Sequence, residues 1–374
     1  MCYNRRMKPL KVDKPFLFSV LILVVFGFFI FTSASLGILA RDSSQFDSIS
    51  ITQLLALGLG LISLFICARI IPHKFWRKYA FYIFLATIVL NLLLFVPKLA
   101  FEHGGATRWI TIGSFTIQPS EFLKIGFIIY FSAWLARVKD NVVKFKYGLL
   151  PFIIIAAILS SLLVAQSDTK TFVIIAFSGL AMLVSAGARW KDIGVVACIG
   201  LMFVGVVAFV RPYAMQRILT FINPASDPLN SGYQIQQSLI AIGSGGMFGR
   251  GFGQSIQKFN FLPEPVGDSI FAVYAEEWGF IGGLALIALF LFFTIRGLKI
   301  ATKSGDLFDS FLIVGIIVLI VSESFMNIAS MVGIIPLSGV PLLFVSHGGT
   351  ALITALGEVG IILNISRYQK KNSI

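Results

Sequence analysis

The sequence predicts an all-α integral membrane protein, with about ten transmembrane helices in a single domain over residues 1–374. Of its 374 residues, 57% are hydrophobic and 13% are charged. A soluble domain has about 45–50% apolar residues and about 25% charged residues. Too few polar side chains remain to cover a water-facing surface. The three cysteines, Cys2, Cys67 and Cys198, are scattered and provide no disulfide framework.

Ten windows are long and apolar enough to cross a bilayer core of about 30 Å, which needs about 20 helical residues. The first begins after Pro15, and it is too long and too poorly followed by a cleavage site to be a removable signal peptide. With ten spans, both termini lie on one side of the membrane. The windows cover residues 16–38, 50–71, 79–97, 120–136, 148–166, 170–187, 193–210, 270–296, 308–334 and 343–366.

The distribution of basic residues predicts which side of the membrane the two termini occupy. Of the 30 Lys and Arg residues, about 21 lie in the termini and in the loops on their side, and about eight lie in the opposite loops. The positive-inside rule therefore places both termini in the cytoplasm. The net charge of +13 reports this orientation. A nucleic-acid partner is not expected, because it needs basic residues gathered on one soluble face.

The segment of about 211–269, between the seventh and eighth windows, is then a large extracytoplasmic loop. Its length indicates a functional segment rather than a simple connection. Residues 239–252 are apolar and glycine-rich, which favours a short helix or re-entrant segment at the outer membrane surface. No inverted repeat typical of secondary transporters is evident, which weakens a transporter interpretation without removing it.

Motifs for nucleotides and metals are missing from the sequence. No glycine-rich loop ends in Lys-Ser or Lys-Thr, so ATP-driven pumping and a nucleotide cofactor are not expected. The histidines, His73, His103 and His347, are far apart, and a zinc site is not expected. An enzyme of this composition needs a membrane-borne substrate and side-chain carboxylates.

The carboxylates inside the predicted spans are few. Glu121 and Lys124 are three residues apart on one helical face, where an ion pair lowers the cost of burying each group. The pair either lines a site or only holds helices together. Glu323 and Glu358 lie in the ninth and tenth windows without an obvious partner, and they are equally open to a functional or a structural role.

Glu264 and Asp268 lie four residues apart just before the eighth window, in a run stiffened by two prolines. A carboxylate at the membrane boundary can have its pKa raised by partial burial, as a general base requires. The alternative is a solvated surface charge.

Two further features are candidates for binding phosphate. Gly245 and Gly246 belong to a glycine cluster whose backbone amides could approach a pyrophosphate closely, although tight turns explain the cluster equally well. Arg108 beside Trp109 has the form of an anion-binding cation with an interfacial aromatic anchor. A snorkelling arginine is the alternative.

Short motifs follow one another in a fixed order along the chain. They lie at residues 33–35, 105–110, 118–124, 223–224, 227–228, 232–234, 240–246, 253–258, 262–264, 268, 276–277, 339–342 and 346–349. This ordered set resembles the SEDS family of bacterial cell-wall polymerases, FtsW and RodA, over almost the whole chain. Residues 253–258 and 130–136 are more similar to the division protein FtsW than to the elongation protein RodA.

The resemblance implies a peptidoglycan glycosyltransferase of the bacterial cytoplasmic membrane. Such an enzyme polymerises lipid II into β-1,4 glycan strands at the outer face during division or elongation. It implies as partners the growing glycan strand, a class B penicillin-binding protein with transpeptidase activity, and other division or elongation proteins. A lipid II flippase and a noncatalytic scaffold are the alternatives.

The resemblance also implies roles for individual residues. Asp268 falls on the family's essential outer-loop aspartate, and we expect it to act as general base on the acceptor's 4-hydroxyl. Arg108 and Lys124 would neutralise the donor's pyrophosphate, with Glu121 orienting Lys124. Glu264 would position the loop or help hold a divalent cation such as Mg²⁺ or Mn²⁺, although no metal site is assigned.

The chain departs from the family pattern at two places. Gly267-Asp268-Ser269 stands where the family has Thr-Asp-Phe, so the aspartate lacks its aromatic neighbour. Residues 166–170 read Gln-Ser-Asp-Thr-Lys where the family has Gln-Pro-Asp-Phe-Gly, which leaves the role of Asp168 open.

Overall fold

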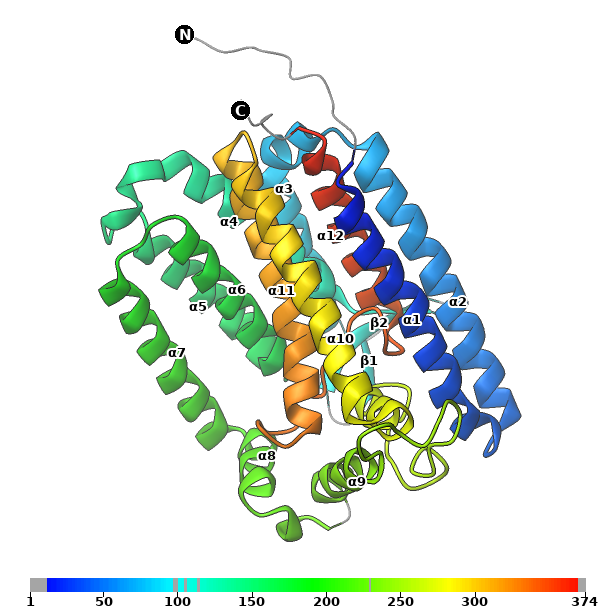
Figure 1. The fold of residues 1–374 in the computed structure, drawn as a ribbon. Helices are drawn as coiled ribbons and strands as arrows, with labels where there is room; N and C mark the ends of the chain where they lie inside the picture. Colours follow the sequence, from blue (N-terminus) through cyan, green and yellow to red (C-terminus); the bar gives the residue numbers. More distant parts are fainter. Residues whose placement is uncertain (1–11, 97–99, 104–105, 113–114, 229, 369–374) are drawn as a thin grey trace.

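The computed structural model describes residues 12–96, 100–103, 106–112, 115–228 and 230–368. Ten of its helices stand side by side in a bundle (Figure 1), and each overlaps one of the ten windows predicted above. They are α1 (Lys14–Leu39), α2 (Ser43–Phe65), α3 (His73–Leu92), α4 (Pro119–Val138), α5 (Leu149–Ala165), α6 (Thr169–Ser185), α7 (Trp190–Val210), α10 (Ile270–Thr302), α11 (Leu307–Met331) and α12 (Gly349–Ser366).

Length and hydropathy make seven of the described helices candidates to cross a membrane, namely α1, α2, α3, α7, α10, α11 and α12. Helices α5 and α6 are apolar but shorter, at 17 residues each. Helix α4 is 20 residues long and carries the buried charges Glu121 and Lys124 in its first half. The predicted helical membrane fold is confirmed, while the count of ten spans and the cytoplasmic placement of the termini stay predictions.

The helices divide into central and peripheral ones. In the most apolar window of α11 and α12, 67% and 78% of residues are buried, against 28% in α2, 22% in α3 and 17% in α7. Because a bilayer accepts apolar side chains as readily as a protein core does, the peripheral helices need no cover from other helices. The centre of the molecule therefore lies around α11 and α12.

Polar caps begin several helices. Asp13 accepts a hydrogen bond from the backbone amide of Phe16 at the start of α1, where Pro15 also occupies the first turn. Asp42 and Asp306 cap α2 and α11 in the same way. These side chains satisfy amides that have no partner within the helix.

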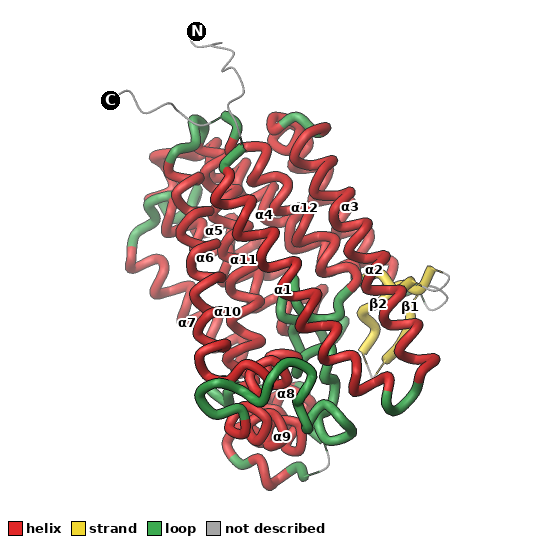
Figure 2. Tube along the Cα trace, turned by 45° about the vertical axis from the view of Figure 1, so that its right-hand side comes forward, coloured by secondary structure: helices red, strands yellow, loops and turns green. Residues whose placement is uncertain are grey.

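The connection between α3 and α4 contains a three-stranded antiparallel sheet, in the order β1-β2-β3 (Figure 2). Its strands are β1 (Ala100–His103), β2 (Ala106–Ile112) and β3 (Phe115–Ile117). The expectation of an all-helical chain did not include this sheet. Strands this short give almost no hydrophobic periodicity in the sequence. The central strand carries Arg108.

The long segment between α7 and α10 contains two short helices, α8 (Pro212–Ile222) and α9 (Ser231–Ser244), followed by turns up to Ser269. A short helix or re-entrant segment was expected over 239–252, and the structure has a helix that begins earlier and ends at Ser244. Beyond it the backbone turns back onto α10, where the Arg250 amide donates to the Glu276 carbonyl at 3.0 Å and the Phe280 amide to the Gly246 carbonyl at 2.9 Å. The kink at Gly279 in α10 frees groups for these bonds.

Candidate active site

Asp268 lies in a turn just before α10 that is fixed from two sides. The Glu264 carbonyl accepts hydrogen bonds from the amides of Gly267 and Ser269, both at 3.1 Å. Asn327 of α11 donates to the Asp268 carbonyl at 2.7 Å. The side chain of Ser346 donates to the Gly267 carbonyl at 2.9 Å. The backbone of Asp268 is therefore held in place, and the residue itself stays half-buried.

Gly339 marks the point where Asp268 and Arg217 converge. A Cβ atom on Gly339 would lie 3.2 Å from Oδ2 of Asp268 and 3.4 Å from Nη2 of Arg217. Its φ of +62° is in the left-handed region, which glycine adopts without strain. A glycine here allows both charged side chains to approach the same stretch of backbone.

Three cations line a cavity of about 250 Å³ beside this point. They are Arg108 from β2, Lys170 from α6 and Arg217 from α8, and most of the remaining wall comes from α7, α8 and the segment before α12. Burial lowers the pKa of Arg217, and the nearby Arg108 acts in the same direction, whereas Asp268 opposes them. Like charges brought together in this way favour an anionic ligand.

Backbone carbonyls hold the three cations in position. The Arg108 guanidinium donates to the Ser167 carbonyl, and the Lys170 ammonium donates to the Gly339 carbonyl. Arg217 donates to the Leu337 carbonyl at 2.6 Å. Each bond uses only part of the cation's donor capacity, since arginine has five donors and lysine three.

Asp168 links the two helices next to the cavity. Its carboxylate is buried and accepts hydrogen bonds from Ser120 of α4 at 2.9 Å and from Thr171 of α6 at 2.8 Å. It thereby ties the two helices together next to Ser167 and Lys170. Although the surrounding motif departs from the family pattern, the aspartate keeps a positioning role.

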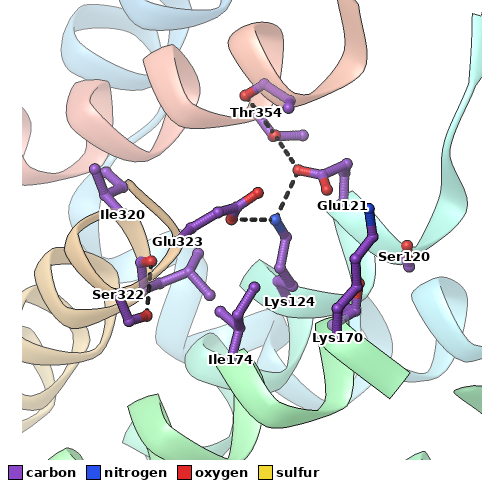
Figure 3. Close-up of polar contacts among 12 residues, drawn as sticks. Ser120, Glu121, Lys124, Lys170, Ile174, Ile320, Ser322, Glu323 and Thr354 are labelled. Atoms are coloured by element: carbon purple, nitrogen blue, oxygen red, sulfur yellow. Dashed lines mark hydrogen bonds and ion pairs between the residues drawn. The ribbon is translucent and has the colours of Figure 1, made fainter. Parts of the chain in front are cut away.

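Lys124 lies in a separate, buried cluster of charges (Figure 3). Its ammonium is 2.9 Å from Oε2 of Glu121 and 2.5 Å from Oε2 of Glu323. The predicted pair of Glu121 with Lys124 is therefore confirmed, and Glu323 has a partner that the sequence did not reveal. Thr354 of α12 donates to Glu121 at 3.4 Å. Glu358, also on α12, is buried close enough for these charges to act on it.

The predicted contact between Lys124 and a pyrophosphate is not supported by this geometry. Lys124 is 2% exposed, binds two carboxylates and does not line the cationic cavity. An ammonium that is buried and doubly paired has already exchanged its water for protein ligands. Of the two predicted pyrophosphate ligands, only Arg108 lies in the cavity.

Of the two roles left open for the glycine cluster, the structure supports tight turns rather than phosphate binding. The Gly245 amide donates to carbonyls of α9, and the Gly246 amide donates to the Gly243 carbonyl. A Cβ on Gly245 would lie 2.2 Å from the Ala275 carbonyl oxygen. The predicted phosphate contact at Gly245 and Gly246 is thus not supported, because these amides are engaged and the close approach is between two protein segments.

Glu264 is exposed and lines a second, polar cavity of about 350 Å³ together with Arg41, away from the cationic cavity. Its main-chain carbonyl accepts the bonds that close the Asp268 turn, and the role of its side chain in positioning the loop stays a prediction. Among the described residues, no three His, Cys, Asp or Glu side chains are grouped to hold a metal. A divalent cation stays a prediction.

The motif residues Glu276 and Glu277 anchor the turns that follow α9. Ser255 donates to Glu276 at 2.6 Å. Lys258, fully buried, donates to Glu277 at 2.7 Å, and Ser33 of α1 also bonds Glu277. These contacts tie α1, the turns and α10 together, so these motifs stabilise the part of the chain that carries Asp268.

The sequence led to no predicted role for Lys170 and Arg217, which are two of the about eight basic residues counted on the outer side. The signal that could have identified them is their scarcity, since only about eight basic residues lie on the outer side of the predicted topology. Each of those eight has no topological role and is a candidate for chemistry.

Comparison with known proteins decides the family. The family model described as "Cell cycle protein", which covers FtsW, RodA and SpoVE, matches residues 14–371. The chain belongs to this family. It is accordingly a multi-pass protein of the cytoplasmic membrane.

Relatives in the FtsW/RodA/SpoVE family match over most of the chain. The stage V sporulation protein E of Bacillus subtilis is 39% identical over 85% of this chain and 87% of its own length. The probable peptidoglycan glycosyltransferase FtsW of Geobacter sp. strain M18 is 35% identical over 95% of this chain and 96% of its own.

Solved structures show the same fold. A chain of a peptidoglycan synthase complex that coordinates polymerization and crosslinking superposes with a TM-score of 0.78 at 24% identity, covering 96% of this chain and 99% of that one. The rod shape determining protein RodA of Thermus thermophilus gives a TM-score of 0.67 at 24% identity, with 96% and 98% covered.

Proposed function

We propose that this chain is a peptidoglycan glycosyltransferase that polymerises lipid II into β-1,4 glycan strands at the outer face of the membrane. The observation that carries the proposal is the convergence of Asp268 and Arg217 at Gly339, beside a cavity that also presents Arg108 and Lys170. A carboxylate next to several cations suits a reaction that removes a proton at one atom and releases a diphosphate at another. The names of the relatives support the same activity.

The reaction follows from these groups. Asp268 accepts the proton of the acceptor sugar's 4-hydroxyl, and the oxygen attacks the anomeric carbon of the donor strand. The bond from that carbon to the phosphate oxygen breaks with inversion, and the polyprenyl pyrophosphate leaves with the bonding electrons. Arg108, Lys170 and Arg217 stabilise its charge, so Lys170 and Arg217 take the place first expected for Lys124.

General base catalysis typically contributes about 10²–10⁴-fold. The remaining acceleration comes from stabilising the leaving group. In other enzymes, removing a single preorganised hydrogen-bond donor lowers kcat by about 10²–10³-fold. The three cations are held by carbonyls before substrate arrives, so little reorganisation is needed.

The partner in this proposal is a class B penicillin-binding protein, whose transpeptidase cross-links the strands that this chain makes. One solved structure with the same fold is a chain of a peptidoglycan synthase complex that coordinates polymerization and crosslinking, which supports a crosslinking partner. The greater similarity of residues 253–258 to FtsW favours cell division as the process. Elongation remains the alternative.

A lipid II flippase is the second candidate. The observation that favours it is the buried cluster of Lys124 with Glu323 and Glu358. Ionisable groups at membrane depth often serve transport. Purified chain in detergent, given lipid II and Mg²⁺ or Mn²⁺, separates the two, since a micelle has no second side. We expect longer glycan by gel electrophoresis. No product in detergent, together with lipid II transfer across vesicles, would overturn the proposal.

A further inference from the structure

A polar cavity of about 390 Å³ lies between the starts of α3 and α11. It is at the end of the bundle where α1 begins and α12 finishes, opposite the end that carries α8 and α9 (Figure 1). Neither the proposed reaction nor the Lys124 cluster uses any of its residues. It is lined by His73, Lys74, Arg77, Lys78, Asp306, Phe308 and Asp309.

One wall of the cavity is cationic. Lys74, Arg77 and Lys78 are spaced by three and four residues, which places them on one face of α3. All three are exposed, and only Arg77 forms an ion pair among the described residues, with Asp306 at 2.8 Å. Two ammonium groups are left to face an anion.

The opposite wall carries a buried carboxylate. Asp309 is 5% exposed, and no described residue donates a hydrogen bond to its side chain or forms an ion pair with it. The charges of Arg77 and Lys74 act on Asp309 only at a distance. A buried carboxylate without a hydrogen-bond donor is disfavoured, and a cationic donor from a ligand would compensate it directly. The cavity therefore matches a ligand that carries an anion and a cation a short distance apart.

The surroundings of the cavity match a membrane boundary. Phe75 and Tyr79 are exposed on α3 beside it, and the Lys78 ammonium lies 5.0 Å from the centre of the Tyr79 ring. Aromatic and basic side chains together mark the level of lipid head groups. Farther along α3, Phe81 and Leu85 are exposed and offer an apolar track for acyl chains.

We propose that this cavity binds the head group of a phospholipid that carries a primary ammonium, such as phosphatidylethanolamine. The phosphate lies against Lys74 and Lys78, and the ammonium donates to Asp309. A primary ammonium has three N–H donors, whereas a quaternary ammonium has none. A glycerol head group has no cation for Asp309. Basic pockets between transmembrane helices are known to hold phospholipid head groups.

The test measures lipid affinity for the full-length purified chain by native mass spectrometry and by thermal unfolding in detergent. Phosphatidylethanolamine, phosphatidylglycerol and phosphatidylcholine with identical acyl chains are compared, with soluble phosphoethanolamine as a fourth ligand. We expect phosphatidylethanolamine to bind about ten-fold more tightly than the other two lipids, as a charged hydrogen bond provides. Equal affinities would overturn the proposal, and so would phosphoethanolamine binding as tightly as the intact lipid.

Variants separate the two halves of the site. Asp309→Asn should remove the preference for phosphatidylethanolamine over phosphatidylglycerol and leave phosphatidylglycerol binding unchanged. Lys78→Gln, an exposed change that spares the core, should weaken both lipids several-fold. Lys144→Gln, another exposed lysine on the same predicted side, is the matched control and should change neither. A preference that survives Asp309→Asn, or lipid binding that Lys78→Gln leaves intact, contradicts the assignment.

Discussion

Lys170 and Arg217 are the residues whose roles differ most from the sequence-based expectation, and they lead to the first prediction. Each donates one hydrogen bond to a backbone carbonyl and keeps further donors for a pyrophosphate. Hydrogen bonds to charged groups contribute about 1.5–3 kcal/mol. We expect Lys170→Gln and Arg217→Gln each to lower kcat/KM for lipid II polymerisation about ten- to a hundred-fold, measured with purified protein.

The matched control is Arg211→Gln. Arg211 is exposed, lies six residues before Arg217, donates to the Val164 carbonyl at 3.2 Å and does not line the cavity. It should polymerise lipid II at close to the wild-type rate. Wild-type kinetics in both Lys170→Gln and Arg217→Gln would show that the leaving group is stabilised elsewhere.

The Lys124 cluster predicts an asymmetry between two substitutions. Lys124→Met leaves Glu121 and Glu323 buried without their common cation, and breaking a buried pair in this way costs about 3–5 kcal/mol. Glu323→Gln keeps the pair of Glu121 with Lys124 and removes one of the surplus carboxylates. Thermal unfolding in detergent should therefore show a much larger loss of stability for Lys124→Met. Equal losses of stability would show that Lys124 is not the common cation of the two carboxylates.

This cluster also shows what a sequence reveals at the residue scale. Glu121 and Lys124 could be paired in advance because residues three apart in a helix lie on the same face. Glu323 is 199 residues from Lys124 along the chain, and nothing local indicates that α11 brings the two together. The same reason explains why Asp268 was identified from the family motif while its neighbour Arg217 was not.

At the scale of elements, the close contact between the end of α9 at Gly245 and α10 at Ala275 leads to the next prediction. Gly245→Ala would place a Cβ 2.2 Å from the Ala275 carbonyl oxygen, so one segment must move. We expect a lower midpoint of thermal unfolding and a loss of polymerisation, because these turns lead to Asp268. The matched control is Gly243→Ala in α9, whose Cβ meets nothing within 4 Å.

Alanine is favoured over glycine in a helix by about 0.5–1 kcal/mol. Gly243→Ala should therefore be neutral or slightly stabilising. A Gly245→Ala variant as stable and active as Gly243→Ala would mean that the two segments are not held in this close contact.

The long helices could be predicted from sequence because apolar length is a strong and local signal. The sheet between α3 and α4 could not, since its strands are short and its stability depends on pairing between them. The helix expected over 239–252 was displaced because the glycine-rich residues after Ser244 pack as turns against α10. Such packing depends on contacts with a distant segment, which the local sequence does not reveal.

For the whole molecule, charge is divided between the two ends of the bundle. About 21 of 30 basic residues lie in the termini and in the loops predicted to share their side, where the positive-inside rule predicts that they set orientation. At the opposite end, Arg108, Lys170 and Arg217 gather beside Asp268. A lipid-linked donor enters such a site from the bilayer, which agrees with the absence of a nucleotide motif in the sequence.

The measurement that tests the proposed mechanism most directly is the rate of lipid II polymerisation by purified Asp268→Asn protein in detergent. Asparagine keeps the size of the side chain and cannot accept the proton, so we predict a loss on the order of 10²–10⁴-fold. Asp47→Asn, which removes an exposed carboxylate near the start of α2, should keep the wild-type rate. Polymerisation by folded Asp268→Asn protein at the wild-type rate would contradict the proposed mechanism.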